Sequence, residues 1–148
     1  MTTLDDFAKF VALDHGLAVV STTRADGTIQ SSVVNAGVLD HPLRGTPVVA
    51  FVSAGGAGRL ANLRARPRTT VVLRAGWQWA AVEGPVELAG PDDPLEGIDA
   101  EQLRVLLRGI FTAAGGTHDD WDEYDRVMAA DRRAAVLITP TRAYTNPG

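Results

Sequence analysis

The residues best suited to bind a ligand lie at the start of a predicted short helix. A glycine-rich turn, Ala54 to Gly58, leads directly into this helix, and Arg59 is its first charged residue. The first turn of a helix has unpaired backbone N–H groups and the positive end of the helix dipole, so it stabilises an anion. The sequence therefore predicts a phosphate site at Gly58 and Arg59, with Ser53 beside it.

Positive charge is concentrated in the segment that follows. Five arginines fall between residues 59 and 74 without any Asp or Glu among them, although the whole chain has a formal net charge of -4. This local excess favours a polyanionic ligand. The alternative is that Arg59 is an ordinary solvated helix residue and that Arg64, Arg66 and Arg68 are surface charges.

Composition and the remaining motifs exclude several classes of protein. The chain has no cysteine, so disulfides, thiolate nucleophiles and zinc–thiolate sites are ruled out. His15, His41 and His118 do not have metal-ligand spacing. Neither G-x-S-x-G, G-x-G-x-x-G nor a Walker A motif occurs, which disfavours a hydrolase triad, a dinucleotide-binding fold and a kinase.

Length and charge distribution predict the organisation and location of the protein. With 148 residues, 45% of them hydrophobic, we expect a single domain over residues 1–148. Residues 91–148 hold six basic and eleven acidic groups, which argues against a nucleic-acid partner. No apolar run is long enough to span a bilayer and the N-terminal segment is acidic, so we expect a cytoplasmic protein without a membrane partner.

The hydrophobic pattern predicts six strands and four helices. A Thr3–Asp6 capping box begins a helix that ends near Gly16, and Asp26-Gly27 marks a hairpin turn. Two further helices begin at the capping boxes Asp99-x-x-Gln102 and Thr117-x-x-Asp120 and precede the last strand. The expected strands are 17–23, 28–39, 48–53, 69–74, 77–88 and 134–140. Hairpin-like connections favour a mainly β fold, a six-stranded antiparallel barrel with the helical pair inserted before the last strand.

This order of elements resembles a known superfamily. The helix, the GLAVVSTTRADGT hairpin, the VVAFVS strand, the glycine loop with Arg59, NLRARPR and WQWAAVEG are similar to the split β-barrel flavin-binding proteins related to pyridoxamine-phosphate oxidase. Within them, the chain looks most like actinobacterial reductases that use the deazaflavin coenzyme F-420. The resemblance covers roughly residues 4–90 and, more loosely, 134–144. The tail TRAYTNPG lacks the Arg-Leu motif of true pyridoxamine-phosphate oxidases, so that activity is not expected.

The resemblance implies roles for particular residues. Arg59 would hold the cofactor phosphate and Asn35 would lie near the cofactor ring. Asn62 is a further candidate, with a local helix contact as its alternative. Trp77 and Trp79, expected on one face of a strand, would line the cofactor pocket or fill the core or a dimer interface. Arg64, Arg66 and Arg68, if they are not simply surface charges, would meet the oligoglutamate tail of the deazaflavin.

The resemblance also implies an activity and an assembly. We expect a homodimer with two cofactor sites at its interface, and transfer of hydride from reduced coenzyme F-420 to a conjugated or quinone-like small molecule. The cofactor carries this chemistry, so no protein residue needs to act as a dedicated general acid. The motifs do not choose between F-420 and FMN. An FMN-dependent oxidoreductase and a non-enzymatic flavin or deazaflavin carrier therefore stay open as alternatives.

Overall fold

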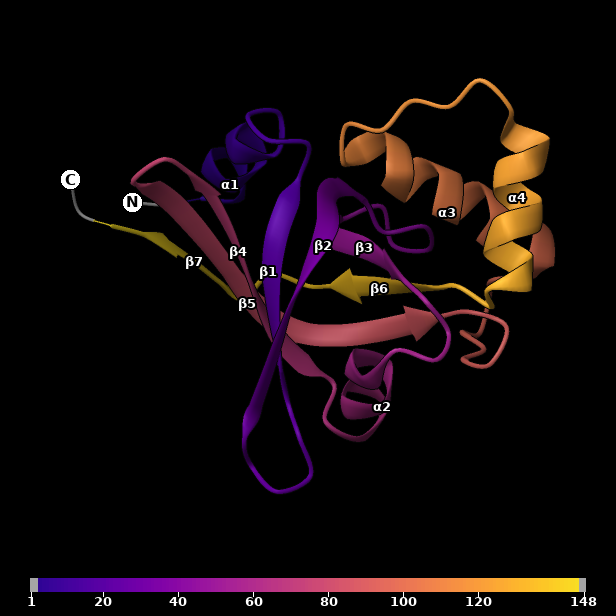
Figure 1. Ribbon diagram of the computed structural model, residues 1–148, viewed down its shortest axis with the longest axis horizontal. Helices are drawn as coiled ribbons and strands as arrows, with labels where there is room; N and C mark the ends of the chain where they lie inside the picture. The colour runs from indigo at the N-terminus through magenta and orange to yellow at the C-terminus, as the bar shows by residue number, and fades with distance from the viewer. Residues whose placement is uncertain (1–2, 147–148) are drawn as a thin grey trace.

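The computed structural model describes residues 3–146, which form a β-barrel with helices on its outside (Figure 1). The elements in chain order are α1 (Leu4–Val11), β1 (Leu17–Thr23), β2 (Ile29–Asp40), β3 (Pro47–Ser53), α2 (Gly58–Ala65), β4 (Arg68–Ala75), β5 (Gln78–Ala89), α3 (Ala100–Ala113), α4 (Trp121–Ala130), β6 (Ala134–Ile138) and β7 (Arg142–Thr145).

Six strands close the barrel. Antiparallel pairing runs in the order β4-β1-β2-β3-β6-β5, and β5 pairs with β4 to complete the ring. The predicted six-stranded antiparallel barrel, with α3 and α4 inserted before its last strand, is confirmed. Closure leaves these six strands with paired neighbours on both sides, so the barrel presents few free edges.

The β1–β2 hairpin turns at the predicted residues. Gly27 has a φ of +86°, and the Asp26 carboxylate accepts the backbone N–H of Thr28 at 3.0 Å. Glycine adopts this left-handed conformation without a steric penalty, which is why Asp-Gly marks the turn in the sequence. The register then places Leu17 opposite Asn35 and Val19 opposite Val33.

The end of the chain adds a strand that the sequence did not predict. The segment expected to be a short tail forms β7, which pairs with the first half of β5, whereas β6 pairs with the second half. The chain changes partner where residues 139–141 pass Gly84, at which any Cβ would overlap the carbonyl oxygen of Thr139. Glycine at this position therefore allows one long strand to serve two partners.

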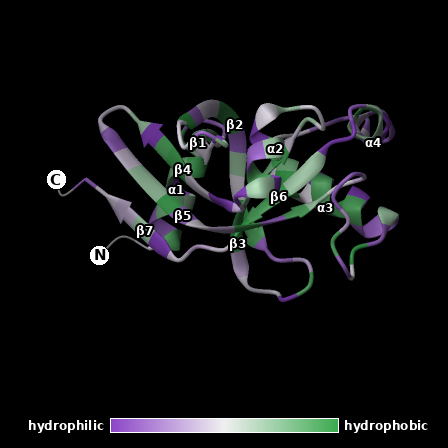
Figure 2. Cartoon of the chain, turned by 90° about the horizontal axis from the view of Figure 1, so that it is seen from below, coloured by the Kyte–Doolittle hydropathy of each residue, from purple (hydrophilic) through white to green (hydrophobic). Residues whose placement is uncertain are grey.

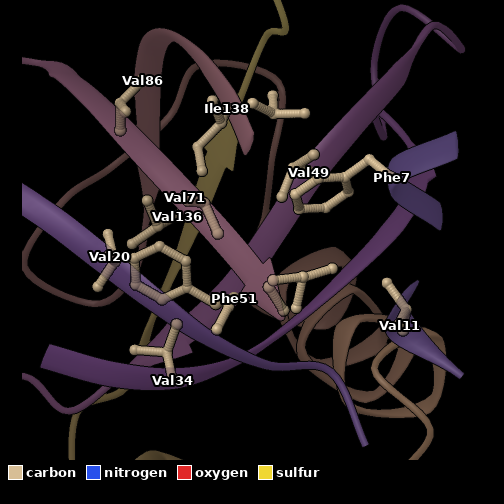
Figure 3. Packing of buried hydrophobic residues seen from close by; sticks show 14 of the residues in the cluster. Phe7, Val11, Val20, Val34, Val49, Phe51, Val71, Val86, Val136 and Ile138 are labelled. Atoms are coloured by element: carbon tan, nitrogen blue, oxygen red, sulfur yellow. The ribbon is translucent and has the colours of Figure 1, made fainter. Parts of the chain in front are cut away.

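Two apolar clusters share β3 and β6. The barrel interior is filled by side chains that include Phe7, Val20, Phe51 and Val136 (Figure 3). A second cluster lies between the outer face of β3 and β6 and the helices α3 and α4. Every residue of β6 is consequently buried, and Figure 2 shows the hydrophobic colour on both of these strands.

The helices begin close to the predicted residues, with one correction. The Thr3 and Asp99 capping boxes are both formed. The box predicted at Thr117 is wrong, because the N-cap of α4 is Asp120, whose carboxylate accepts the N–H of Glu123 at 3.1 Å. In residues 3–146, no helix combines the length and the apolar character needed to cross a bilayer.

Candidate anion and cofactor site

Arg59 lies at the end of the barrel, where it contacts two strands. Its Nε donates to the hydroxyl of Ser32 on β2 at 3.1 Å, and its Nη1 donates to the hydroxyl of Ser53 on β3 at 2.9 Å. Ser53 is fully buried and Arg59 is half-buried. We refer to Ser32, Ser53 and Arg59 as the serine–arginine cradle.

The cradle has a positive charge without a neutralising carboxylate. Among residues 3–146, no ion pair is formed by Arg59, and its two side-chain partners are neutral hydroxyls. Burial lowers the pKa of the Arg59 guanidinium, and the positive charge of Arg133 lowers that pKa further. A half-buried cation in this state gains from an anionic partner, since burying an unpaired charge is unfavourable.

The start of α2 offers further donors beside this guanidinium. The N-cap residue Ala57 has no side chain to accept a hydrogen bond, and the first turn of α2 contains no acidic residue. The first N–H groups of a helix then require water or a ligand as acceptor. Gly58 lies close to the side chain of Gln30: a Cβ added at Gly58 would lie 3.3 Å from the Gln30 amide. The predicted grouping of Ser53, Gly58 and Arg59 is thus present in one place.

The other arginines of the cluster are directed elsewhere. Arg64 forms a bidentate ion pair with Asp93, with N–O distances of 2.7 and 2.8 Å. Arg66 donates to the carbonyl of Thr23, Arg68 to the hydroxyl of Thr141 and Arg74 to the carbonyl of Gly76. Arg64 is therefore neutralised by an acidic residue from a distant part of the chain, whereas the acceptors of Arg66, Arg68 and Arg74 are neutral groups.

Asn62 contacts the barrel rather than an open space. Its Nδ2 donates to the Thr22 hydroxyl at 3.1 Å and to the Gln30 side-chain oxygen at 2.9 Å. These bonds tie α2 to β1 and β2. Asn62 therefore positions the helix that carries Arg59.

Asn35 lines a pocket between the barrel and the inserted helices. Its Nδ2 donates to the carbonyl of His15 at 2.9 Å, which fixes the orientation of the amide. The pocket has a volume of about 580 Å³, and we call it the α3–α4 pocket. Its walls include Val52, Phe111, His118, Tyr124 and Arg133 as well as Asn35.

The pocket and the cradle meet at the end of β3. Val52 lines the pocket, and the next residue, Ser53, binds Arg59. Because successive side chains of a strand point to opposite faces, the cradle lies on the inner side of the end of β3 and the pocket lies on its outer side. A volume of this size is typical of small-molecule sites.

The two tryptophans do not join this site within one chain. Trp77 lies in the turn before β5 and is 96% exposed, so the expectation that both indoles share one face of a strand is wrong. Trp79 is half-buried and packs edge-on against Tyr144, with ring centroids 6.1 Å apart. The β4–β5 turn and the α3–α4 pair lie at opposite ends of the molecule (Figure 1).

Sequence reasoning missed Ser32 and Arg133. Ser32 is one of two adjacent serines on an alternating strand, and only its pairing with Arg59 distinguishes it from Ser31. Arg133 lies far from the glycine loop in sequence and reaches the site through the β3–β6 pairing. Neither residue has a local motif that could have identified it.

A second cavity lies on the other side of Tyr124 and Met128. It has a volume of about 600 Å³ and an apolar lining that includes Pro94, Leu95 and Leu103. None of the residues predicted from the sequence lines this cavity. We therefore place the candidate site at the cradle and the α3–α4 pocket.

Comparison with known proteins supports the fold assignment. No family model matches the sequence. A conserved hypothetical protein from Mycobacterium tuberculosis has a similar structure, with a TM-score of 0.68 and 17% identity over 98% of this chain and 84% of that chain. An F-420 reductase aligns with a TM-score of 0.58 and 15% identity, over 90% of this chain and 93% of the other.

An FMN-binding protein related to pyridoxamine 5′-phosphate oxidase, from Nostoc punctiforme, aligns with a TM-score of 0.64 and 11% identity, over 92% of this chain and 76% of that chain. These likenesses place the chain in the split-barrel fold, which was predicted from the motifs. At such low identity they do not assign an activity, since one fold hosts several functions.

Proposed function

We propose that the protein is a cytoplasmic reductase that binds reduced coenzyme F-420 and transfers hydride to a conjugated or quinone-like organic acceptor. The phosphate of the cofactor would lie on the serine–arginine cradle, and its ring would lie in the α3–α4 pocket. The observation that carries this proposal is the half-buried guanidinium of Arg59, which is held by two hydroxyls and has no carboxylate partner among the described residues.

The cradle suits an anionic group such as a phosphate. The guanidinium binds phosphate oxygens through directed, charge-assisted hydrogen bonds. The start of α2, which has no side-chain cap, adds the positive end of a helix dipole next to Arg59 in the chain. Both features favour a phosphorylated ligand over a neutral one.

The cofactor supplies the hydride, and the protein residues supply binding and orientation. Arg59 and Ser53 would fix the phosphate end. Asn35 would contact the polar edge of the ring, because its amide is already oriented by His15. Phe111 and Tyr124 give the pocket apolar walls that keep water away from the reacting face.

Cofactor titration tests this proposal. Purified protein is titrated with coenzyme F-420 and with FMN at matched salt, and binding is followed by fluorescence. Tighter binding of F-420 is expected, because its charged tail adds contacts that FMN lacks. If FMN binds at least as tightly, the protein is an FMN-dependent oxidoreductase instead.

A second experiment separates a reductase from a carrier. Oxidation of the reduced cofactor by a panel of quinones and enones is compared with and without protein. A reductase should accelerate the reaction with a rate that saturates with acceptor, and Asn35→Ala should lower turnover more than it lowers stability. A carrier would slow oxidation by covering the ring, and then the enzyme assignment fails.

The proposed unit is a homodimer. The outer face of β1 and β2 exposes Leu17, Val19, Ile29 and Val33, of which Val19 and Val33 are direct neighbours across the strands. Leu17, Val19 and Val33 are adjacent on this face, whereas the Ser21–Ser31 pair separates them from Ile29. An exposed apolar group of this kind favours a protein partner. Asn35 follows on the same face of β2, opposite Leu17, so a second copy on this face would lie beside the α3–α4 pocket.

A further inference from the structure

Arg133 occupies a position that normally holds an apolar side chain. The N–H of Arg133 donates to the carbonyl of Met128 at 3.0 Å, and the N–H of Arg132 donates to the carbonyl of Ala129 at 3.1 Å. Arg132 has a φ of +51°, which completes a Schellman motif at the end of α4. In this motif the residue at the position of Arg133 often makes a hydrophobic contact with the helix residue at the position of Met128.

The Arg133 guanidinium is incompletely satisfied at this position. Its Nε is buried and has no hydrogen-bond partner among the described residues. Its Nη2 has one contact, with Asp131 at 3.3 Å, and both of these side chains are partly exposed. A buried donor without an acceptor is unfavourable and rare in folded proteins, so an arginine at this position points to a function for the partly exposed end of its guanidinium.

The backbone holds Arg133 at the same strand end as the serine–arginine cradle. Ser53 is paired with Ala134, the residue that follows Arg133. The N–H of Gly55 donates to the carbonyl of Asp131 at 3.1 Å, and a Cβ on Gly55 would lie only 2.6 Å from the carbonyl of Arg132. The glycine loop and the end of α4 are therefore packed backbone to backbone.

Charge and position together connect Arg133 with the ligand site. The positive charge of Arg133 is felt at Arg59. Arg133 also lines the α3–α4 pocket, with His118, Asp119, Glu123 and Tyr124 as the other polar or titratable groups from the α4 side. Two arginines, Arg59 and Arg133, therefore lie near the same end of β3 and β6.

We propose that Arg133 is a second ligand-binding cation, which together with Arg59 holds a phosphorylated ligand that carries two negative charges. This inference rests on the proposed phosphate role of the cradle and extends it. The second charge has two possible sources. It belongs either to the same phosphate, as in a phosphomonoester such as FMN, or to a carboxylate of the tail, as in coenzyme F-420.

The first test uses Arg133→Met with three probes, namely inorganic phosphate, FMN and riboflavin, which is FMN without its phosphate. We expect phosphate and FMN to bind about tenfold more weakly to the variant, as for loss of one charge-assisted contact. Riboflavin should bind equally to both proteins. Calorimetry measures phosphate binding, and flavin fluorescence measures the other two.

Arg126→Met is the matched control. Arg126 is an exposed arginine of α4, so the variant has the same net charge as Arg133→Met and leaves the α3–α4 pocket unaltered. It should bind all three probes normally. The inference would be overturned if Arg126→Met lost as much affinity for phosphate and FMN as Arg133→Met does. It would also be overturned if Arg133→Met bound riboflavin as weakly as FMN relative to the parent, or bound phosphate as tightly as the parent.

The same variant distinguishes the two sources of the second charge. The second ionisation of a phosphomonoester occurs near pH 6, so the tenfold difference for FMN should shrink at pH 5 relative to pH 8. For F-420 the ratio should stay constant, because its tail carboxylates stay largely ionised over this range. The corresponding ratio for Arg126→Met at both pH values is the control for charge changes elsewhere in the pocket. Equal dissociation constants for variant and parent at pH 8, for both FMN and F-420, would contradict the inference.

Stability without ligand gives a readout that is independent of the cofactor. Methionine at position 133 would remove the unpaired donor and restore the apolar contact of the Schellman motif. The melting temperature of Arg133→Met should therefore rise by a few degrees, whereas a residue with a purely structural role would lower it. If phosphate binding needs both arginines while neither flavin binds, the proposed function fails and this inference stands.

Discussion

Arg59 shows at the level of a single residue how the fold prepares a binding group. Ser53 comes from β3, which directly precedes α2, and Ser32 comes from β2; the two hydroxyls orient the guanidinium without neutralising it. An aspartate at either position would have formed an internal ion pair. The hydroxyls therefore keep the positive charge available for a ligand.

Arg59→Ala should lose ligand affinity and stay folded. Removing one charge-assisted partner of a phosphate should cost about 1.5–3 kcal/mol, which is roughly a tenfold to hundredfold increase in the dissociation constant. Fluorescence titration with F-420 and FMN measures this loss, and circular dichroism checks the fold. Arg64→Ala is the control, because its partner is Asp93. Unchanged affinity in Arg59→Ala would show that this residue is only surface charge.

Glu87 gives a prediction for the pH dependence of stability. The hydrogen bond from Arg44 is the main cause that lowers the pKa of Glu87 below its ordinary value of 4.5, with further contributions from the charge of Arg44 and from His41. A carboxylate whose pKa is lower in the folded state stabilises the fold above pH 4.5. This stabilisation is lost as the pH falls through the folded-state pKa.

Urea unfolding of Glu87→Gln measures this effect. The variant should be less stable than the parent at pH 7, and the two should converge as the pH falls below 4.5 through the folded-state pKa of Glu87. Glu101→Gln serves as a control, since Glu101 pairs with Arg104 at an exposed position and should have a smaller effect. A constant difference between Glu87→Gln and the parent at all pH values would contradict the assignment.

At the level of elements, β5 depends on a glycine because it changes partner from β7 to β6. Gly84→Ala should destabilise the protein by about 1–3 kcal/mol, since a Cβ at this position overlaps the backbone of Thr139 and the strand or the 139–141 segment must move. Gly56→Ala is the control, because nothing lies within 4 Å of a Cβ there. Chemical denaturation of both variants is the measurement, and equal stabilities would rule out this role for Gly84.

Sequence patterns predicted the elements whose cause is local. Asp26-Gly27 specifies its turn by its own backbone preference, and the capping residues Thr3 and Asp99 fix the starts of α1 and α3. The start of α4 was misplaced because Thr117 and Asp120 have capping chemistry too. The structure resolves the choice in favour of Asp120, whose own N–H is bonded to the His118 ring.

The site was predictable only where its residues adjoin the glycine loop. Ser53, Gly58 and Arg59 are nearly consecutive, so their common location follows from one turn. The partners of Arg64 and Arg59 depend on long-range pairing, and Asp93, Ser32 and Arg133 have no sequence signal that links them to the loop. Strand β7 was missed because its four residues are only partly buried and lack an apolar pattern.

At the level of the whole molecule, the exposed apolar face of β1 and β2 predicts a dimer. Light scattering should give twice the 15.7 kDa chain mass. Val33→Lys should shift the protein toward the monomer without unfolding it, because Val33 is 62% exposed in the single chain. Val105→Lys is a control on α3, where Val105 is similarly exposed at 55%. A parent protein that is monomeric at micromolar concentration would remove the basis for a shared site.

The position of β6 between two apolar clusters has a consequence for local unfolding. Its residues pack inward against the barrel core and outward against the α3–α4 pair, and its backbone is bonded to β3 on one side and β5 on the other. Opening β6 therefore disrupts both clusters at once. Backbone amides of Ala135 to Leu137 should therefore exchange with deuterium only through global unfolding, at a rate set by the full unfolding free energy. Amides in the solvent-facing turns of α4 should exchange faster, through local opening. Exchange of these β6 amides as fast as those of α4 would show that the helical pair and the barrel unfold independently.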